Sequence, residues 1–380
     1  MTLHAPKQKS KLQNSPKKLF LKIHRTLGIF IGILLIIIGT TGSFLVFHDE
    51  LETALQPQLI KVVPEGERLS VDAIAKSVKQ ADKNAQLQFI LLPQNPEESY
   101  KVKVKSGARE IAAFVNPYTG AILGWWGFDS IVTHFLLKIH MTLLAGKVGE
   151  IVVGICGLFL LLLCITGIRL WSGWKRLIPA FKVRWQAPLR LFAFDLHQVS
   201  GILAVVFLSL ISITGIFFVV AHNSPAFLSM FVTRPSEVEL SAIAKTAKPI
   251  TITEAIQIAD RELPNSKTTY LAFAEKERKI TVHKKYPEDI FPSGLSSVSI
   301  DRHTKKVLSV QKVLKPSFGN RVAKLIVDFH FGTFGGMTSK VIYVFVGLSP
   351  TVLFITGLTI YRLRTHPQTV ARVNRELINR

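Results

Sequence analysis

The chain has 380 residues, of which 48% are hydrophobic, and a formal net charge of +22. In a soluble protein this charge would favour nucleic acid as a partner, but here the basic residues gather beside apolar stretches, so we exclude nucleic acid. The two cysteines, Cys156 and Cys164, lie in one such stretch, which excludes a disulfide framework.

Four apolar stretches are long enough to cross a membrane, because about 20 apolar residues span a ~30 Å hydrocarbon core. They lie near residues 26–47, 150–171, 198–220 and 340–361. The first stretch is too long for a cleaved signal peptide and lacks a small-residue cleavage site. We predict a first spanning helix at 23–48, an amphipathic approach and second helix at 129–172, a third helix at 196–222 and a fourth at 319–362.

Basic residues indicate which ends of these helices face the cytoplasm. Residues 1–25, 169–196 and 361–380 together carry 18 Lys and Arg but only 2 acidic residues. Such an excess is typical of cytoplasmic segments. We therefore expect a lipid-contacting basic tail at 1–22, a basic loop at 173–195 and a tail at 363–380, with both termini cytoplasmic.

The two long loops, 49–128 and 223–318, have the same predicted design and would lie outside. Each begins with a capped amphipathic helix, near Ser70 and near Thr251. Short β-like runs follow at 88–92, 100–104 and 112–115, and again at 269–274, 279–283 and 296–300. The sequence thus predicts a mainly α membrane protein, a four-helix bundle built from two tandem repeats, with two external α+β domains.

Four histidines recur at matched distances from glycines. Gly42 follows His24 by 18 residues, as Gly215 follows His197; Gly167 follows His140 by 27 residues, as Gly357 follows His330. A threonine precedes each of these four glycines. The repeated spacing indicates a duplication in which both copies keep ionisable residues where lipid makes them costly.

Neutral imidazole is a common axial ligand of haem iron. A duplication axis along the membrane normal would pair His24 with His197 on the inner side and His140 with His330 on the outer side. Two imidazoles leave no open position on the iron, so such sites suit electron transfer. The absence of C-x-x-C-H favours two non-covalently held haem b groups. We expect their irons on the order of 20 Å apart.

Two features of this interpretation stay open in the sequence. The glycines Gly42, Gly167, Gly215 and Gly357 are explained equally by helix–helix packing and by room for a flat macrocycle. His48 and His222 end the first and third helices on the outer side, so they are alternative outer ligands or polar groups near an electron acceptor. His222 falls on the helix face of His197, whereas His48 falls off the face of His24.

The external loops resemble the PepSY domain, a helix laid on a small antiparallel sheet that ends in a D-x-x-T-G-like turn. The turns here are 116–120, with Asn116 in place of Asp, and 301–305, with Lys305 in place of Gly. With the histidine segments 23–28, 138–143, 195–201 and 328–332, nearly the whole chain resembles the PepSY-associated transmembrane family, and in particular FoxB-type inner-membrane siderophore-iron reductases.

This resemblance implies a bacterial inner-membrane ferric-siderophore reductase that passes electrons through two haems to the periplasm and releases Fe(II). No G-x-G-x-x-G or Walker A motif follows a strand, so electrons would come from a membrane quinol or a cytoplasmic reductase. The main alternative is a non-enzymatic PepSY membrane protein that binds peptides or a protease partner, with structural histidines. A transporter is disfavoured because the spanning stretches lack midplane charge.

Overall fold

The computed structural model describes residues 16–365 except 108, 128–131, 232–248 and 275–276. Most of the tails expected at 1–22 and 363–380 therefore lie outside the described residues. The chain divides into a helical unit (residues 1–46, 136–223 and 327–380) and a sheet unit (residues 47–135 and 224–326).

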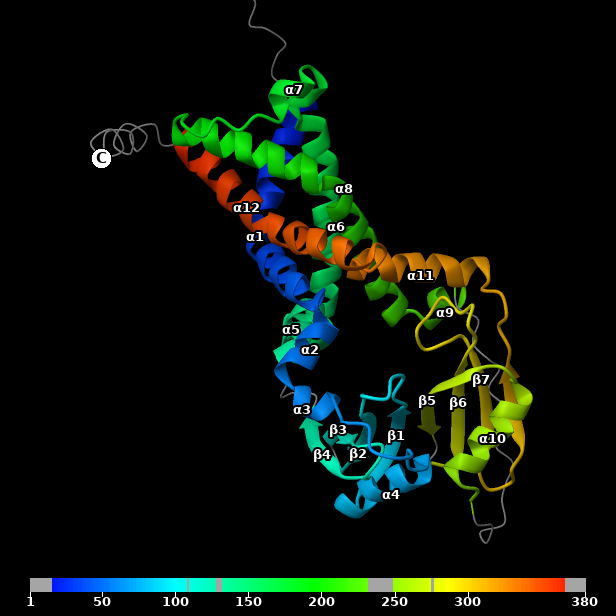
Figure 1. The fold of residues 1–380 in the computed structure, drawn as a ribbon. Helices are drawn as coiled ribbons and strands as arrows, with labels where there is room; N and C mark the ends of the chain where they lie inside the picture. Colours follow the sequence, from blue (N-terminus) through cyan, green and yellow to red (C-terminus); the bar gives the residue numbers. More distant parts are fainter. Residues whose placement is uncertain (1–15, 108, 128–131, 232–248, 275–276, 366–380) are drawn as a thin grey trace, which may run out of the picture. The chain divides into compact units, whose positions relative to one another are not determined.

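The helical unit contains four helices that are long and apolar enough to cross a membrane. They are α1 (Pro16–Leu45), α6 (Gly146–Leu170), α8 (Leu189–Asn223) and α12 (Gly336–Thr365) (Figure 1). The short elements η2 (Ser172–Trp174) and α7 (Leu177–Ala180) connect α6 to α8. The four predicted long apolar helices are confirmed, and their length and composition make them candidates for spanning a membrane.

These four helices pack in a ring. Helix α1 contacts α6 and α12, and α8 contacts the same two helices, so α1 and α8 are diagonal to each other. A backbone close approach joins α1 to α12, where a Cβ on Gly39 would lie 2.4 Å from the carbonyl oxygen of Gly347. At the matching place between α8 and α6, the Ser212 hydroxyl donates to the carbonyl of Gly157. Small residues therefore set both close crossings.

The second and fourth predicted segments are each divided into two helices. Helix α5 (Val132–Thr142) precedes α6, and α11 (Phe318–Phe331) precedes α12. Leu143 and Leu144 adopt left-handed φ angles of 48° and 61° at the first break, and Gly332 has a φ of 70° at the second. Because non-glycine residues rarely adopt this conformation, the leucine break could not be expected from composition. His140 and His330 therefore lie at the ends of the short helices.

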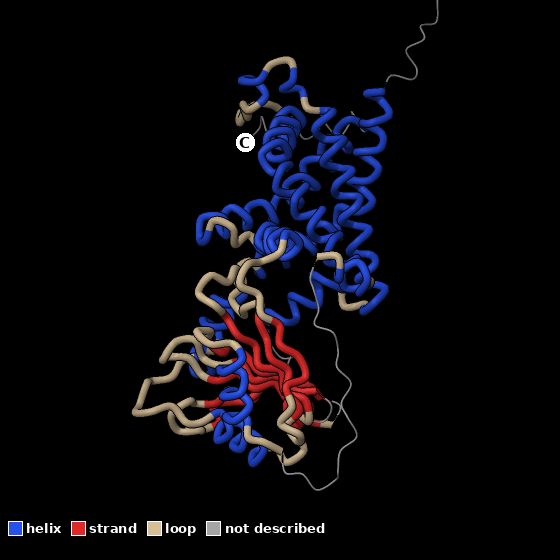
Figure 2. The backbone as a smooth tube through the Cα atoms, turned by 90° about the vertical axis from the view of Figure 1, so that its right-hand side faces the viewer, coloured by secondary structure: helices blue, strands red, loops and turns tan. Residues whose placement is uncertain are grey.

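The sheet unit contains one eight-stranded antiparallel sheet (Figure 2). The strands are β1 (Ala85–Leu91), β2 (Tyr100–Ser106), β3 (Arg109–Val115), β4 (Ile122–Gly127), β5 (Lys267–Ala274), β6 (Lys279–Lys285), β7 (Ser296–Asp301) and β8 (Val307–Gln311). Their order is β4-β3-β2-β1-β5-β6-β7-β8, so each half is a four-stranded meander. Pairing of β1 with β5, in which Ile90 faces Leu271, makes the two halves one sheet.

Helices α4 (Val71–Ala81) and α10 (Ile252–Glu262) cover one hydrophobic core on this sheet, which Ile74, Ala255 and Val102 help to form. Ser70 caps α4, and Thr251 and Glu254 form a capping box on α10, as the sequence predicts. The Asp72 carboxylate accepts the backbone amides of Ile252 and Thr253 at 2.7 and 2.8 Å, which ties the two halves together.

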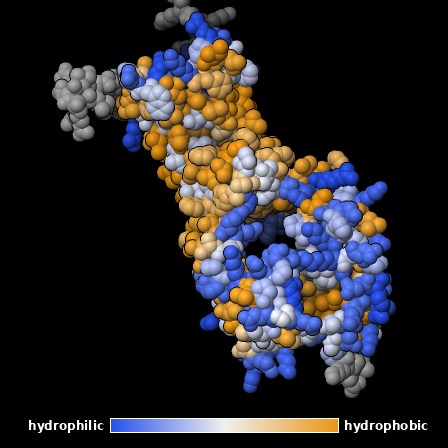
Figure 3. All heavy atoms as spheres, viewed as in Figure 1, coloured by the Kyte–Doolittle hydropathy of each residue, from blue (hydrophilic) through white to orange (hydrophobic). Residues whose placement is uncertain are grey.

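The sheet unit also contains α2 (His48–Leu55), α3 (Pro57–Ile60) and α9 (Pro225–Ser229), together with residues 132–135 of α5 and 318–326 of α11. Helix α3 contributes Leu59 to a second apolar cluster, whose other buried members are Ala112, Phe114 and Trp126. Hydrophobic side chains cover the helical unit's visible surface, whereas hydrophilic ones dominate that of the sheet unit (Figure 3). This contrast is expected when only the helical unit faces lipid.

Candidate functional site

Two of the predicted histidines meet at the centre of the helix ring. His24 of α1 and His197 of α8 have ring centroids 6.1 Å apart and ring planes at 87°. Their helices are diagonal, so the two imidazoles approach across the bundle rather than along one helix contact. The structure thus brings together the pair expected on the inner side.

The second predicted pair also meets. His140 of α5 and His330 of α11 have ring centroids 6.2 Å apart and ring planes at 62°. The ring of Phe218 lies 5.1 Å from that of His330. The breaks after α5 and α11 place these histidines on short helices of their own, outside α6 and α12. Two pairs with nearly the same separation therefore occur in one unit.

Each histidine is held through Nδ1 by a threonine of another helix. The Nδ1–Oγ1 distances are 2.8 Å for His24 with Thr166, 3.3 Å for His140 with Thr41, 3.0 Å for His197 with Thr356 and 2.9 Å for His330 with Thr214. These are the threonines that precede the four glycines in the sequence. The sequence indicated these threonines only as part of a repeat, whereas the structure shows that each contacts Nδ1 of a histidine.

In two of the four cases a backbone carbonyl three residues before the threonine also accepts from Nδ1. The carbonyl oxygens of Ile38 and Leu353 lie 2.9 and 3.0 Å from the Nδ1 atoms of His140 and His197. A carbonyl can only accept a hydrogen bond, so Nδ1 carries the hydrogen in these two rings.

The threonine geometry agrees with this tautomer. The hydroxyl of Thr166 lies 2.8 Å from the carbonyl oxygen of Leu162, and the other three hydroxyls also reach carbonyls one turn back. Each hydroxyl donates its hydrogen there and offers a lone pair to Nδ1–H. When Nδ1 carries the hydrogen of a neutral imidazole, Nε2 keeps a lone pair that can bind a metal.

The four glycines lie against the imidazole rings. A Cβ added to Gly42 would be 2.9 Å from Cε1 of His140, and one added to Gly357 would be 3.3 Å from Cε1 of His197. Gly215 and Gly167 face His330 and His24 in the same way, at 3.4 and 3.5 Å. The space these glycines leave is thus taken by histidine rings. The glycines thus give the imidazole rings room beside the helices, and their contact with a macrocycle stays a prediction.

The pair geometry fits haem iron. An iron bound at about 2 Å by Nε2 of two opposed imidazoles places the ring centroids roughly 6 Å apart. The measured 6.1 and 6.2 Å agree with this separation. Ring planes at 87° and at 62° would both allow the two histidines of a pair to hold one iron. The four histidine residues are partly buried.

The alternative outer residues are placed differently. His222 is exposed near the end of α8. His48 begins α2, in the sheet unit, where its Nε2 lies 3.4 Å from Oε1 of Glu52. Neither is part of the His140–His330 pair. His134 of α5, which the sequence suggested as an interface residue, lies close to His48 and Glu52.

The fold defines a multi-helix protein with four helices long and apolar enough to cross a membrane and a separate α+β sheet unit. Residues 21–364 match the profile of the PepSY-associated TM region. The chain therefore belongs to the PepSY-associated TM family.

One relative among curated proteins is PA4219 of Pseudomonas aeruginosa, which is described as uncharacterized. It is 40% identical over 83 residues, which is 21% of this chain and 20% of the relative. The match thus spans about a fifth of the relative's length.

Proposed function

We propose that this chain is a dihaem inner-membrane oxidoreductase that passes electrons outward to a ferric siderophore in the periplasm. The observation that carries the proposal is the repeated pair geometry, with ring centroids 6.1 and 6.2 Å apart and every Nδ1 within hydrogen-bond distance of a threonine hydroxyl. Histidines with a purely structural role would not require the same arrangement at all four positions.

The proposed roles follow from the contacts. His24 and His197 would hold one haem b, and His140 and His330 the other, through their Nε2 atoms. Thr41, Thr166, Thr214 and Thr356 orient the rings and keep Nδ1 protonated. Haem iron supplies one-electron transfer, and two axial imidazoles suit that role because they leave no position for oxygen.

The substrate part of the proposal rests on family resemblance and on iron chemistry. One electron converts Fe(III) to Fe(II), which matches hard oxygen chelators less well and leaves the siderophore more readily. The sheet unit would face the periplasm if the basic segments mark the cytoplasmic side. The electron donor would be a membrane quinol or a cytoplasmic reductase, and both termini would lie in the cytoplasm.

The test begins with the absorption spectrum and redox titration of the purified protein in detergent. We expect a Soret band and reduced α-bands of two bis-histidine haems. The reduced protein should then be oxidised anaerobically by a ferric siderophore, with Fe(II) captured by a colorimetric chelator. The same siderophore loaded with gallium(III) is the matched control, because it keeps the shape of the complex but accepts no electron.

Two results would count against the proposal. A protein purified from haem-replete cells without a Soret band would leave the non-enzymatic PepSY alternative, in which the helices only anchor a peptide-binding or protease-binding unit. A haem-loaded protein that stays reduced with the ferric siderophore would exclude the substrate while keeping the cofactor.

A further inference from the structure

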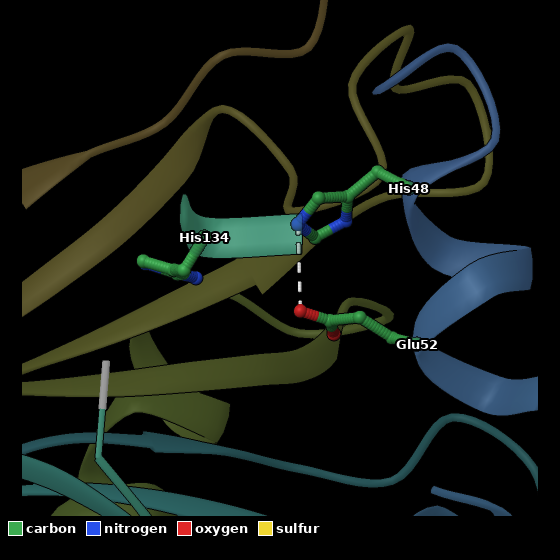
Figure 4. A group of neighbouring side chains, drawn as sticks. All are labelled: His48, Glu52 and His134. Carbon is green, nitrogen blue, oxygen red and sulfur yellow. Dashed lines mark ion pairs between the residues drawn. The ribbon is translucent and has the colours of Figure 1, made fainter. Parts of the chain in front are cut away.

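A second group of metal-ligating side chains lies within the sheet unit. His48, Glu52 and His134 each offer one ligand atom, and these atoms all lie within 4.8 Å of one another. His48 and Glu52 are one turn apart on α2, and His134 is in the first turn of α5. Figure 4 shows the three side chains directed toward a common space.

The carboxylate of Glu52 is unusual because it is buried, with 8% of the residue exposed. Its neighbours are distant for hydrogen bonds: the Thr133 hydroxyl lies 3.4 Å from Oε1, and Nζ of Lys101 lies 3.7 Å from Oε2. A buried carboxylate is costly unless nearby positive charge compensates it closely. The loose contacts leave Oε1 able to bind a cation.

The spacing of His48 and Glu52 suits a shared ion. Nε2 of His48 lies 3.4 Å from Oε1 of Glu52. Two atoms bound to one ion at about 2.1 Å are roughly 3 to 3.5 Å apart in octahedral or tetrahedral geometry. His134 needs only a small shift to join them, since all three atoms are already within 4.8 Å.

A second carboxylate orients the first histidine. Oδ1 of Asp49 lies 3.1 Å from Nδ1 of His48. Because an ionised carboxylate only accepts hydrogen bonds, Nδ1 carries the hydrogen and Nε2 can present its lone pair toward Glu52. A carboxylate behind a histidine is a common second layer around protein-bound metals, where it fixes the ring and raises its basicity.

The positive charge of Lys101 would repel a cation bound to Glu52. Its Nζ lies 3.7 Å from Oε2 of Glu52 and 5.6 Å from the ring centroids of both Phe114 and Trp126. These contacts keep the ammonium on the Oε2 side of the carboxylate, whereas His48 and Thr133 lie on the Oε1 side. The arrangement favours a monodentate carboxylate ligand through Oε1.

We propose that His48, Glu52 and His134 bind a divalent first-row transition-metal ion, with Fe(II) and Zn(II) as the typical occupants of two imidazoles and one carboxylate. Such a set leaves coordination positions open for water or a further ligand. This site is separate from the four histidines of the helical unit, and its binding chemistry does not depend on the proposed reductase activity.

The experiment uses the full chain in detergent, stripped with a chelator and dialysed to equilibrium against Co(II) alone. Cobalt is counted by mass spectrometry, so any haem iron in the protein is counted separately. We expect one saturable Co(II) per chain. We further expect Zn(II) to displace it, because both ions accept nitrogen and oxygen ligands in tetrahedral geometry.

Variants separate a metal site from an ion-pair network. His48→Asn, Glu52→Gln and His134→Asn should each weaken Co(II) binding by about 100-fold or more, and Asp49→Asn by about 10-fold. Glu50→Gln, an exposed carboxylate on the same helix, is the matched control and should bind as the unaltered protein does. Lys101→Met should tighten binding, because it removes the opposing positive charge.

Glu52→Gln keeps the shape of the side chain, so it remains informative if a histidine variant fails to fold. Normal gel-filtration behaviour and unchanged tryptophan fluorescence would show that each variant is folded. Absence of stoichiometric Co(II) in the unaltered protein would overturn the proposal. Equal binding by folded Glu52→Gln and Glu50→Gln would overturn it as well.

Discussion

Nδ1 of His24 lies 2.8 Å from the hydroxyl oxygen of Thr166, a residue 142 positions later in the chain. The same contact joins His197 to Thr356 at 3.0 Å. Each histidine is therefore oriented by a helix other than its own. If these rings bind haem iron, the threonines control the tautomer and the direction of Nε2.

Replacing this hydroxyl should weaken haem binding without removing it. We predict that Thr166→Val lowers haem affinity about 10-fold, because Nδ1 of His24 loses the hydroxyl that orients its ring while the imidazole itself is kept. Thr166→Ser should restore the affinity, since it keeps the hydroxyl. Haem retention during titration with apomyoglobin measures the effect. Equal retention by the Val and Ser variants would contradict the orienting role.

The glycines facing the histidines should differ in their tolerance of a methyl group. A Cβ at position 42 would lie 2.9 Å from Cε1 of His140, whereas one at position 167 would lie 3.5 Å from Cε1 of His24. The shorter distance requires the ring to move, and the longer one is an ordinary contact. We therefore predict that Gly42→Ala lowers haem content or changes the spectrum of one haem and that Gly167→Ala does neither. The reverse order would show that these glycines do not position the rings.

The two histidine pairs and several strands could be predicted from the sequence, because each produces a regular spacing of residues along the chain. The threonine–glycine spacing indicated the repeat and the two histidine pairs, and alternating residues indicated strands such as β2 and β6. Both patterns reflect local geometry, which a single chain segment carries by itself.

Other features depend on contacts between distant segments and could not be predicted. The left-handed Leu143 and Leu144, which separate α5 from α6, have no compositional signal. The threonine contacts join residues 99 to 159 positions apart. The proximity of His134 to His48 likewise arises only when α5 and α2 fold together.

A buried histidine should make the stability of the sheet unit sensitive to acid. His283 stacks on Tyr270 with ring centroids 3.8 Å apart, and burial lowers its pKa from 6.5 to about 4. The unfolded chain then binds the proton more readily than the folded one. The stability from this residue is therefore present above pH 6.5 and is lost as the pH falls toward about 4.

If His283 were fully buried, acidification would lower the free energy of unfolding by roughly 3 kcal/mol. Because His283 is partly exposed, we expect a decrease of about 2 kcal/mol. Thermal unfolding followed by the β-sheet circular dichroism signal in nanodiscs measures it at several pH values. His283→Phe should remove this part of the pH dependence, and His303→Phe, in the turn after β7, should leave it in place. The same slope in both variants would assign the acid sensitivity to other groups.

The Asp72 carboxylate should hold α10 on the sheet. Asp72→Asn weakens three hydrogen bonds from the start of α10, two from backbone amides and one from the Thr253 hydroxyl, and removes a negative charge from the helix N-terminus. We predict that the local stability of α10 decreases by about 1 to 2 kcal/mol. It should be measurable as faster hydrogen exchange in α10. Glu262→Gln, at the exposed far end of that helix, is the control and should exchange as the unaltered protein does.

The number of haems per chain tests the central claim most directly. A pyridine haemochrome assay on purified protein should give two haem b per chain, one for each histidine pair. His197→Ala and His330→Ala should each lower the ratio to one, and their difference spectra should identify two distinct haems. A ratio that stays at two in the folded His197→Ala and His330→Ala proteins, or an unaltered protein with no haem, would contradict the account.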